Sequence, residues 1–128
     1  ETESHYFASK YAIVENQTSS DSCVVNGTDS RLVDWRPNSR VSTFGAPVGD
    51  HVVMLNSRVT IHVDNVCESF ETQFGDRFPG NHNRLNLQAA IAAVTSAGLS
   101  TEQIQSSIHQ LSSLEFRLQR EAEVNGRR

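Results

Sequence analysis

Apolar residues recur with helical spacing in the run that follows residue 86. Four of them fall at positions i, i+3, i+4 and i+7 of one helical face: Leu87, Ala90, Ile91 and Val94. This spacing predicts an α-helix that packs its apolar face on a core. Gly98 follows at the position where a left-handed C-cap is expected, so we expect the Ala-rich run to end at Ala97.

A second helix is predicted directly after this glycine. Ser100, with Gln103 three residues later, is a capping-box pattern that marks the amino terminus of a helix. An apolar stripe with the same spacing follows and extends to Leu114: Ile104, Ile108 and Leu111. We expect the two helices to pack against each other as a connected pair.

Short β-branched runs predict strands in the first half of the chain. Ser22–Asn26 is typical of a central strand and places Asn26 and Asp29 at its carboxyl end. Ligands bind at the carboxyl ends of parallel strands, so these two side chains are candidate ligand contacts. Arg40–Gly45 is a second predicted strand, and the loop before it gives a shortened crossover.

Two further runs predict a small antiparallel hairpin. His51–Leu55 and Arg58–Asp64 partly alternate between apolar and polar residues and are separated by Asn56-Ser57. We expect this hairpin to be an appendage to the main sheet. Glu68–Phe78 is expected to pair as an edge strand, and Tyr6–Asn16 lacks glycine and proline, which favours the tail of a helix. The fold class is therefore α/β.

The composition limits the classes of function. A chain of 128 residues that is 37% hydrophobic suits one modest domain. Its net charge of −4 and scattered arginines give no basic stripe, which argues against a nucleic-acid partner. No apolar run approaches the roughly 20 residues of a membrane-spanning helix. Residues 1–4 also lack the character of a signal peptide, so we expect a cytoplasmic protein that does not contact membranes.

The two cysteines lie far apart in the sequence. Cys23 and Cys67 each sit in a strand-like stretch. This arrangement favours ordinary buried thiols over a disulfide framework or a zinc site.

The most informative polar segment is Gly80–Asn86, which places His82, Asn83 and Asn86 at a helix entry. Asn83 and Asn86 are three residues apart and share one helical face, where each amide offers both a donor and an acceptor. Such a pair suits the edge of an adenine ring. The alternative is that Asn83 is only an N-cap and Asn86 a solvated surface residue.

The order of these segments resembles the second half of the central, ATP-binding domain of the Mur ligase family. Gly80–Asn86 and the helix after it resemble the family's Gly-x-His-Asn-x-x-Asn segment, and Leu114–Gln119 resembles its Leu-Pro-His-Arg-x-Glu. The resemblance spans residues 6–126. Three further segments look most like the branch that adds D-glutamate: Glu15–Thr18, Asp21 and Val24–Asn26.

This resemblance implies ATP as the cofactor. It assigns His82, Asn83 and Asn86 to the adenine and Arg117 to the phosphates, where a guanidinium fork suits phosphate oxygens. The residues before Arg117 are Glu115-Phe116 in place of Pro-His, and Gln119 replaces the glutamate, so the geometry near Arg117 can differ from that of the family. The alternative for Arg117 is a surface arginine at a domain edge.

The resemblance also implies Mg²⁺ and a modified lysine. Tyr6–Lys10 resembles the family's Tyr-x-x-x-Lys, in which the lysine is carbamoylated and helps to hold magnesium. Carbamoylation converts a cation into an oxygen ligand of the kind that Mg²⁺ accepts. The alternative for Lys10 is a solvated helix lysine.

The implied reaction adds D-glutamate to UDP-N-acetylmuramoyl-L-alanine through an acyl phosphate, in peptidoglycan precursor synthesis. The sequence has no Gly-x-x-x-x-Gly-Lys-Ser/Thr segment, so we expect part of a longer ligase that is inactive alone. Residues 1–116 would be the carboxyl-terminal part of the central domain, and 117–128 a linker and the start of the next domain. The alternatives are another Mur-ligase-like protein, of the MurT or folylpolyglutamate synthase type, or a non-catalytic α/β interaction module.

Overall fold

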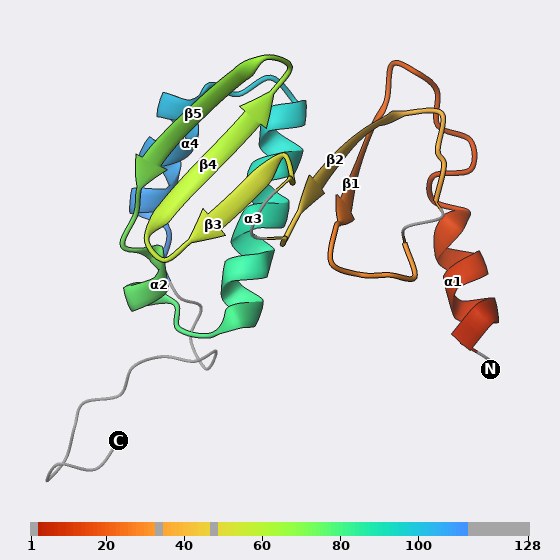
Figure 1. Cartoon of the computed structure of the whole chain (residues 1–128), viewed down its shortest axis with the longest axis horizontal. Helices are drawn as coiled ribbons and strands as arrows, with labels where there is room; N and C mark the ends of the chain where they lie inside the picture. Colours follow the sequence, from red (N-terminus) through yellow and green to blue (C-terminus); the bar gives the residue numbers. More distant parts are fainter. Residues whose placement is uncertain (1–2, 33–34, 47–48, 113–128) are drawn as a thin grey trace, which may run out of the picture.

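The computed structural model describes residues 3–32, 35–46 and 49–112 and has an α/β fold (Figure 1). Within these residues five strands form one sheet in the order β1-β2-β3-β4-β5. The strands are β1 (Ser22–Asn26), β2 (Arg40–Phe44), β3 (Val52–Leu55), β4 (Arg58–Val63) and β5 (Val66–Glu71). The helices are α1 (Glu3–Tyr11), α2 (Phe74–Arg77), α3 (Asn81–Ser96) and α4 (Thr101–Gln110).

The sheet is mixed. β1 and β2 are parallel over their whole length, from the pair Ser22↔Arg40 to the pair Asn26↔Phe44. β3, β4 and β5 are antiparallel. The predicted parallel strands and hairpin are therefore confirmed. The prediction that Ser22–Asn26 is a central strand was wrong, because β1 lies at the edge of the described sheet and pairs with β2 alone. The prediction that the hairpin is an appendage was wrong, because β3 joins β2 in parallel at Phe44↔Val52 and continues the same sheet.

Two tight turns build the antiparallel part. Asn56 and Asp64 open these turns with φ angles of 54° and 52°, a left-handed conformation that Asn and Asp tolerate better than other non-glycine residues. The second turn leads into β5, so the predicted edge strand exists but ends at Glu71. The rest of that predicted strand contains α2, in which Phe74 is buried against the core.

Helix α3 begins at Asn81, before the apolar stripe that predicted it, and packs on β1, β2 and β3. Its end confirms the glycine C-cap: Gly98 has a φ of +94°, and the Leu99 amide donates to the Val94 carbonyl over 3.1 Å. The predicted capping box of Ser100 and Gln103 is present at α4.

Helix α4 packs on α3 and β5, which confirms the connected pair. It stops at Gln110, earlier than the predicted stripe, because Leu111 has an extended backbone with ψ of 137° and an exposed side chain. Ile104 and Ile108 are the buried residues of its stripe. Leu114, the last residue of that stripe, lies outside the described residues.

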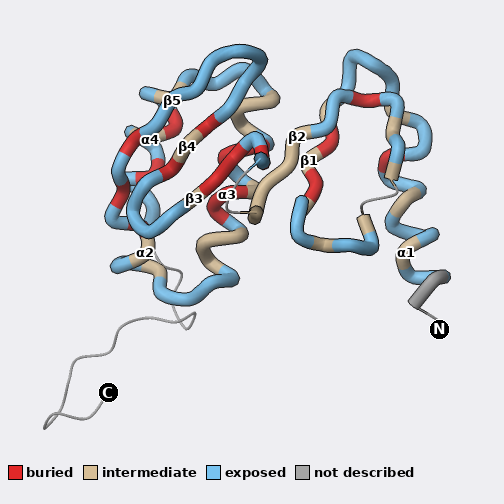
Figure 2. Tube along the Cα trace, in the orientation of Figure 1, coloured by how far each residue is buried: buried red, intermediate tan, exposed pale blue. Residues whose placement is uncertain are grey.

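The hydrophobic core has two parts of unequal size, and Figure 2 shows the buried positions along the chain. The large cluster joins the three antiparallel strands to α2, α3 and α4: Val52, Val59, Ile61, Phe70, Phe74, Leu87, Ile91, Ala92, Ile104 and Ile108. The small cluster contains Val14, Cys23 and Val25, with Tyr11, Leu32 and Trp35 packed against it. Since Val24 packs on the large cluster and its strand neighbours on the small one, the two clusters lie on opposite faces of β1.

The amino-terminal helix is shorter than predicted. α1 ends at Tyr11, and the amides of Val14 and Glu15 both donate to the Tyr11 carbonyl in the turns that follow. These turns place Val14 in the small cluster. The expected helix up to Asn16 was therefore wrong beyond Tyr11. The turns bury Val14 in the small cluster, and the β-branched residues Ile13 and Val14 disfavour a continued helix.

The two cysteines differ in their surroundings. Cys23 is buried in β1, and this burial raises the pKa of its thiol. Cys67 is exposed on β5, so the prediction that both are buried was wrong for Cys67. Neither thiol forms a disulfide within the described residues. None of the described helices has the length and apolar character to cross a membrane.

Candidate functional site

The loops after β1 and β2 meet the start of α3 at Gly45. A Cβ atom added at Gly45 would lie 2.8 Å from Asn26 Oδ1 and 3.3 Å from Leu85 Cδ2. Gly45 also has a φ of +106°, which favours glycine. This close approach brings the carboxyl ends of two parallel strands to the first turns of a helix, which is where α/β sheets bind ligands.

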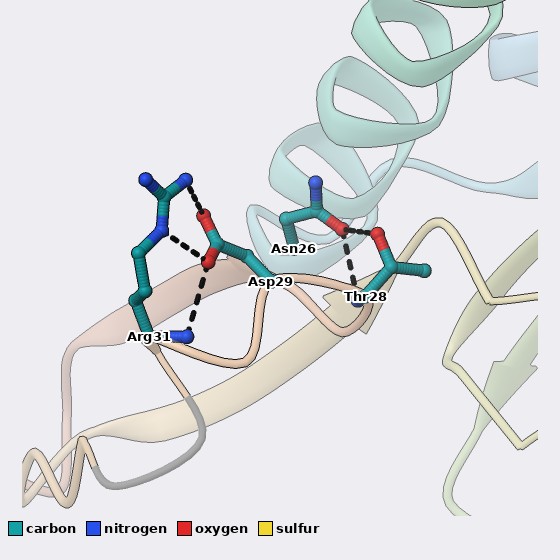
Figure 3. Close-up of polar contacts among 4 residues, drawn as sticks. All are labelled: Asn26, Thr28, Asp29 and Arg31. Atoms are coloured by element: carbon teal, nitrogen blue, oxygen red, sulfur yellow. Dashed lines mark hydrogen bonds and ion pairs between the residues drawn. The ribbon is translucent and has the colours of Figure 1, made fainter.

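Asn26 organises the turn after β1 (Figure 3). Its Oδ1 accepts a hydrogen bond from the Thr28 backbone amide over 3.0 Å and another from the Thr28 hydroxyl over 2.8 Å. Both bonds use the oxygen of the amide group, so the Nδ2 donor takes no part in this turn. The predicted placement of Asn26 at the carboxyl end of a parallel strand is confirmed.

Asp29 and Arg31 form an ion pair beside this turn (Figure 3). Arg31 Nε donates to Asp29 Oδ1 and Arg31 Nη2 to Asp29 Oδ2, both over 2.8 Å. The side-chain hydrogen bonds from Arg31 lower the pKa of the Asp29 carboxyl. The Arg31 guanidinium also lies 4.6 Å from the centroid of the Phe7 ring, which connects the loop to α1.

Asp50 holds the loop that follows β2. Its carboxylate is buried, and Oδ2 accepts a hydrogen bond from the Ala46 amide over 2.7 Å. A Cβ atom at Gly27 would lie 2.4 Å from Asp50 Oδ1, so only glycine leaves room for this carboxylate. Gly27 also donates its amide to the Phe44 carbonyl, and the two loops are thereby fixed to each other.

The three predicted adenine contacts lie on the first two turns of α3. The N-cap of this helix is Gly80, without a side-chain cap, so the alternative that Asn83 is the N-cap was wrong. Asn83 is half-buried and its Nδ2 donates to the Pro79 carbonyl over 2.9 Å. Asn86 is exposed and bonds to no described residue through its side chain. His82 is exposed, and its ring lies over Gly80.

The side-chain amides of Asn83 and Asn86 and the loops after β1 and β2 lie on different sides of α3. Leu85 lies against Gly45, directly after β2, whereas half-buried Asn83 and exposed Asn86 project from other sides of the same turns. The first turn of α3 carries no acidic side chain, so its positive dipole end is not offset locally. A ring or anion at this helix start would therefore reach the amide pair from solvent.

Lys10 is separate from the amide pair. It is exposed on α1, a helix that lies away from α3 (Figure 1). With Asp29 and Arg31 it lines a pocket of about 680 Å³, and its Nζ lies 5.3 Å from the Tyr6 ring centroid. No group of three or more His, Cys, Asp or Glu side chains in the described part of the chain could hold a metal ion. Arg117 lies outside the described residues.

Comparison with known families decides what kind of chain this is. Residues 1–94 match the Mur ligase middle domain. The chain belongs to the Mur ligase family. This confirms the resemblance inferred from the motifs.

This Mur ligase chain is similar to several relatives that bear the name of one ligase. The UDP-N-acetylmuramoylalanine–D-glutamate ligases of Bacillus subtilis (strain 168) and Geobacillus kaustophilus (strain HTA426) are each 31% identical to it over 137 residues, covering 99% of the chain. The enzyme of that name from Synechococcus sp. (strain JA-3-3Ab) is 35% identical over 105 residues, covering 79% of the chain. The chain covers 28%, 28% and 22% of these relatives, respectively. No solved structure matches it significantly.

The structure also identifies Mur ligase residues that the sequence patterns did not. Thr28 and Asp50 fix the two strand loops, and neither was predicted to act there. Gly27 was the available signal, because a glycine directly after a strand often marks a close backbone approach. The roles of Lys10 and of the α3 side chains toward ATP and magnesium stay predictions.

Proposed function

We propose that this chain supplies the adenine-binding part of an ATP-dependent ligase that adds D-glutamate to UDP-N-acetylmuramoyl-L-alanine in the cytoplasm. The observation that carries the proposal is the pair of half-buried Asn83 and exposed Asn86 on α3, which begins near the carboxyl ends of two parallel strands. Relatives that bear the name of this ligase support the same choice of substrates.

Adenine recognition follows from the chemistry of the two amides. Adenine presents an amino donor next to a ring nitrogen acceptor, and an asparagine amide can bind both. The Nδ2 of Asn83 already donates to Pro79, so its Oδ1 is the atom offered to the adenine amino group. Asn86 offers both functions, and His82 lies beside the ring. The residues that contact the other side of the adenine would come from outside the described residues.

The phosphate and magnesium contacts depend on the family resemblance. Arg117 would contact phosphate oxygens, and a carbamate on Lys10 would supply an oxygen ligand to Mg²⁺. The exposed amine of Lys10 is accessible to carbon dioxide. Among the described residues Asp29 lines the same pocket, but Arg31 engages its carboxylate, so further ligands would come from ATP and the rest of the ligase. When bound, Mg²⁺ offsets phosphate charge during acyl phosphate formation.

We infer the same division of the chain as before, with residues 1–116 in the central domain and 117–128 leading into the next. The 128 residues contain no Gly-x-x-x-x-Gly-Lys-Ser/Thr segment. Alone, the chain is therefore expected to release no phosphate from ATP. An assay of phosphate release from ATP, with the 128-residue chain and with the protein encoded by the full reading frame, tests this directly.

The adenine assignment is tested in the full-length ligase encoded by the reading frame that contains residues 1–128. Asn83→Ala or Asn86→Ala should raise the KM for ATP about tenfold with little change in kcat, because each removes a hydrogen bond made in both ground and transition states. Asn65→Ala is the matched control, since Asn65 is an exposed asparagine on the β4–β5 turn. An unchanged KM in both α3 variants would remove the adenine assignment.

The same assay tests Lys10. Lys10→Ala should lower kcat, with partial recovery on addition of short carboxylates that replace the carbamate oxygens. Full activity of this variant would exclude the magnesium role. If the full-length ligase instead accepts a different amino acid, the family stands and the D-glutamate assignment is wrong.

A further inference from the structure

The side chain of Gln88 forms a hydrogen bond with the edge of β3, at a point where β3 has no strand neighbour among the described residues. β2 ends at Phe44, so within the described residues the backbone of β3 beyond Val52 has no strand on that side. The Met54 amide points to this open edge and donates to Gln88 Oε1 over 3.1 Å. Gln88 is 4% exposed, and its Nε2 donates to the Arg84 carbonyl over 3.3 Å. The second turn of α3 is thereby attached to β3.

Arg84 attaches the first turn of α3 to the hairpin. Its Nη2 donates to the Asn56 carbonyl over 2.9 Å, at the turn between β3 and β4. The guanidinium passes close to α2, where a Cβ atom at Gly75 would lie 3.2 Å from Nη2. The guanidinium therefore fits between the hairpin turn and α2, in contact with both.

The two attachments lie one helical turn apart and nearly opposite the amide pair. Each residue advances an α-helix by about 100°, so Gln88 points within about 40° of Arg84. Asn83 and Asn86 point about 100° to 160° away from Arg84 in the other direction. Two bonds on one side of a helix fix both its rotation and its position along the axis. The direction of the amides on the other side is then fixed as well.

We propose that Arg84 and Gln88 are positioning residues that hold Asn83 and Asn86 in the orientation that binds adenine. This inference rests on the proposed function, because it assigns a task to residues that support the same site. Neither side chain touches the nucleotide in this scheme. Arg84 acts through the hairpin turn and Gln88 through the β3 edge.

Arg84 is the better residue to change. The Asn56 carbonyl that it bonds lies in an exposed turn, where water can replace the guanidinium. Removing Gln88 would instead leave the Met54 amide without its acceptor near the core, which lowers stability as well. Arg84 variants therefore separate orientation of α3 from folding of the chain.

The test compares Arg84→Met with Arg84→Lys in the full-length ligase. Arg84→Met should raise the KM for ATP about three- to tenfold, while kcat and the KM for D-glutamate change less than about twofold. Arg84→Lys should recover part of the loss, because an ammonium can still donate to the Asn56 carbonyl. Arg58→Met is the matched control, since Arg58 lies on the same hairpin but pairs with Glu71.

A second readout uses the 128-residue chain. The side-chain amide signals of Asn83 and Asn86 in a ¹⁵N–¹H spectrum should shift in Arg84→Met and stay in place in Arg58→Met. A residue needed only for folding would change the unfolding midpoint without this local shift or the selective rise in KM. Unshifted amide signals together with an unchanged KM would overturn the inference.

The outcomes for the two proposals are distinct. If Asn83→Ala raises the KM for ATP but Arg84→Met does not, the positioning role is wrong and the adenine site stands. If the asparagine variants leave the KM unchanged, the proposed function fails, and the positioning role toward adenine fails with it. A rise in KM in both sets, with Arg58→Met unaffected, supports both.

Discussion

The two halves of the sheet differ in what holds them together. The antiparallel half, β3 to β5, shares a cluster of ten buried residues with three helices in the described part of the chain. The parallel half, β1 and β2, has a cluster of three buried residues on its other face. The carboxyl end of β1 carries instead a polar turn that contains Asn26 and Asp29. Packing is concentrated in one half and candidate chemistry lies at the end of the other.

Helix α3 belongs to both halves. It packs on β1 and β2 as well as on β3, and its buried residues Leu87 and Ile91 are part of the large cluster. The loops of the weakly packed half are therefore placed by a helix that the strongly packed half stabilises. Regions with fewer buried contacts open at lower free energy, so β1 and β2 should be the first strands to exchange their amides.

The largest expected effect comes from equal truncations in the two clusters. Val59 is 0% exposed and belongs to the large cluster, whereas Val25 is 9% exposed and belongs to the small one. Val59→Ala should lower the free energy of unfolding by about 2 to 3 kcal/mol, from lost burial plus a residual cavity. Val25→Ala should lower it by about 1 kcal/mol, because its surroundings are less completely packed. Urea titration of both variants measures the difference.

Leu55→Ala serves as the control for this comparison, because Leu55 is exposed on β3. Its effect should stay within about 0.5 kcal/mol. Equal losses in Val59→Ala and Val25→Ala would show that the two halves are equally well packed, and the contrast between them would be wrong.

A smaller effect is expected from the cap of α4, which belongs to the strongly packed half. The Ser100 hydroxyl accepts from the Gln103 amide, and the Gln103 side chain accepts from the Ser100 amide. Ser100→Ala should cost about 1 kcal/mol of stability, the usual loss for an N-cap hydroxyl. Ser106→Ala, an exposed position inside the same helix, should be neutral or slightly stabilising. Thermal unfolding of the pair provides the measurement.

The smallest effect concerns the ion pair of the parallel half. Arg31→Met should let the pKa of Asp29 rise toward its ordinary value of 3.8, because the side-chain hydrogen bonds from Arg31 lower it. A lowered carboxyl pKa stabilises the folded state above the ordinary pKa, and this contribution is lost as the pH falls through the folded value. The stability difference between variant and parent should therefore narrow below pH 3.8. Carboxyl NMR titration that shows no rise would contradict the assignment.

The sequence predicted the elements whose signals are local. The helix predicted from the Leu87 stripe, the glycine at residue 98 and the capping box of α4 each depend on residues within a few positions, and all three are confirmed. The buried face of that helix differs from the predicted stripe, because Ala90 is exposed and Gln88 and Ala92 are buried. The place of the hairpin in the sheet was not predictable in the same way. It depends on the pairing of Phe44 with Val52 across a connecting loop, and no local pattern encodes that contact.

The candidate site shows the same limit. The position of Asn83 and Asn86 at a helix start followed from residue types and spacing, and the structure confirms that position. The attachments of Arg84 and Gln88 did not follow, because the Met54 amide needs an acceptor only where β2 has already ended. Residues 117–128, to which a phosphate contact was assigned, lie outside the described part of the chain.

The narrow junction between β2 and β3 has a mechanical consequence. One residue pair joins these strands, and the ring of His51 adds hydrogen bonds to the Thr43 amide and hydroxyl at 3.1 Å. So few bonds constrain the angle between the β1–β2 pair and the β3–β5 strands only weakly. Side-chain packing between α3 and the sheet therefore sets this angle. Substitutions on the sheet-facing side of α3 should consequently change this angle before they unfold either group of strands.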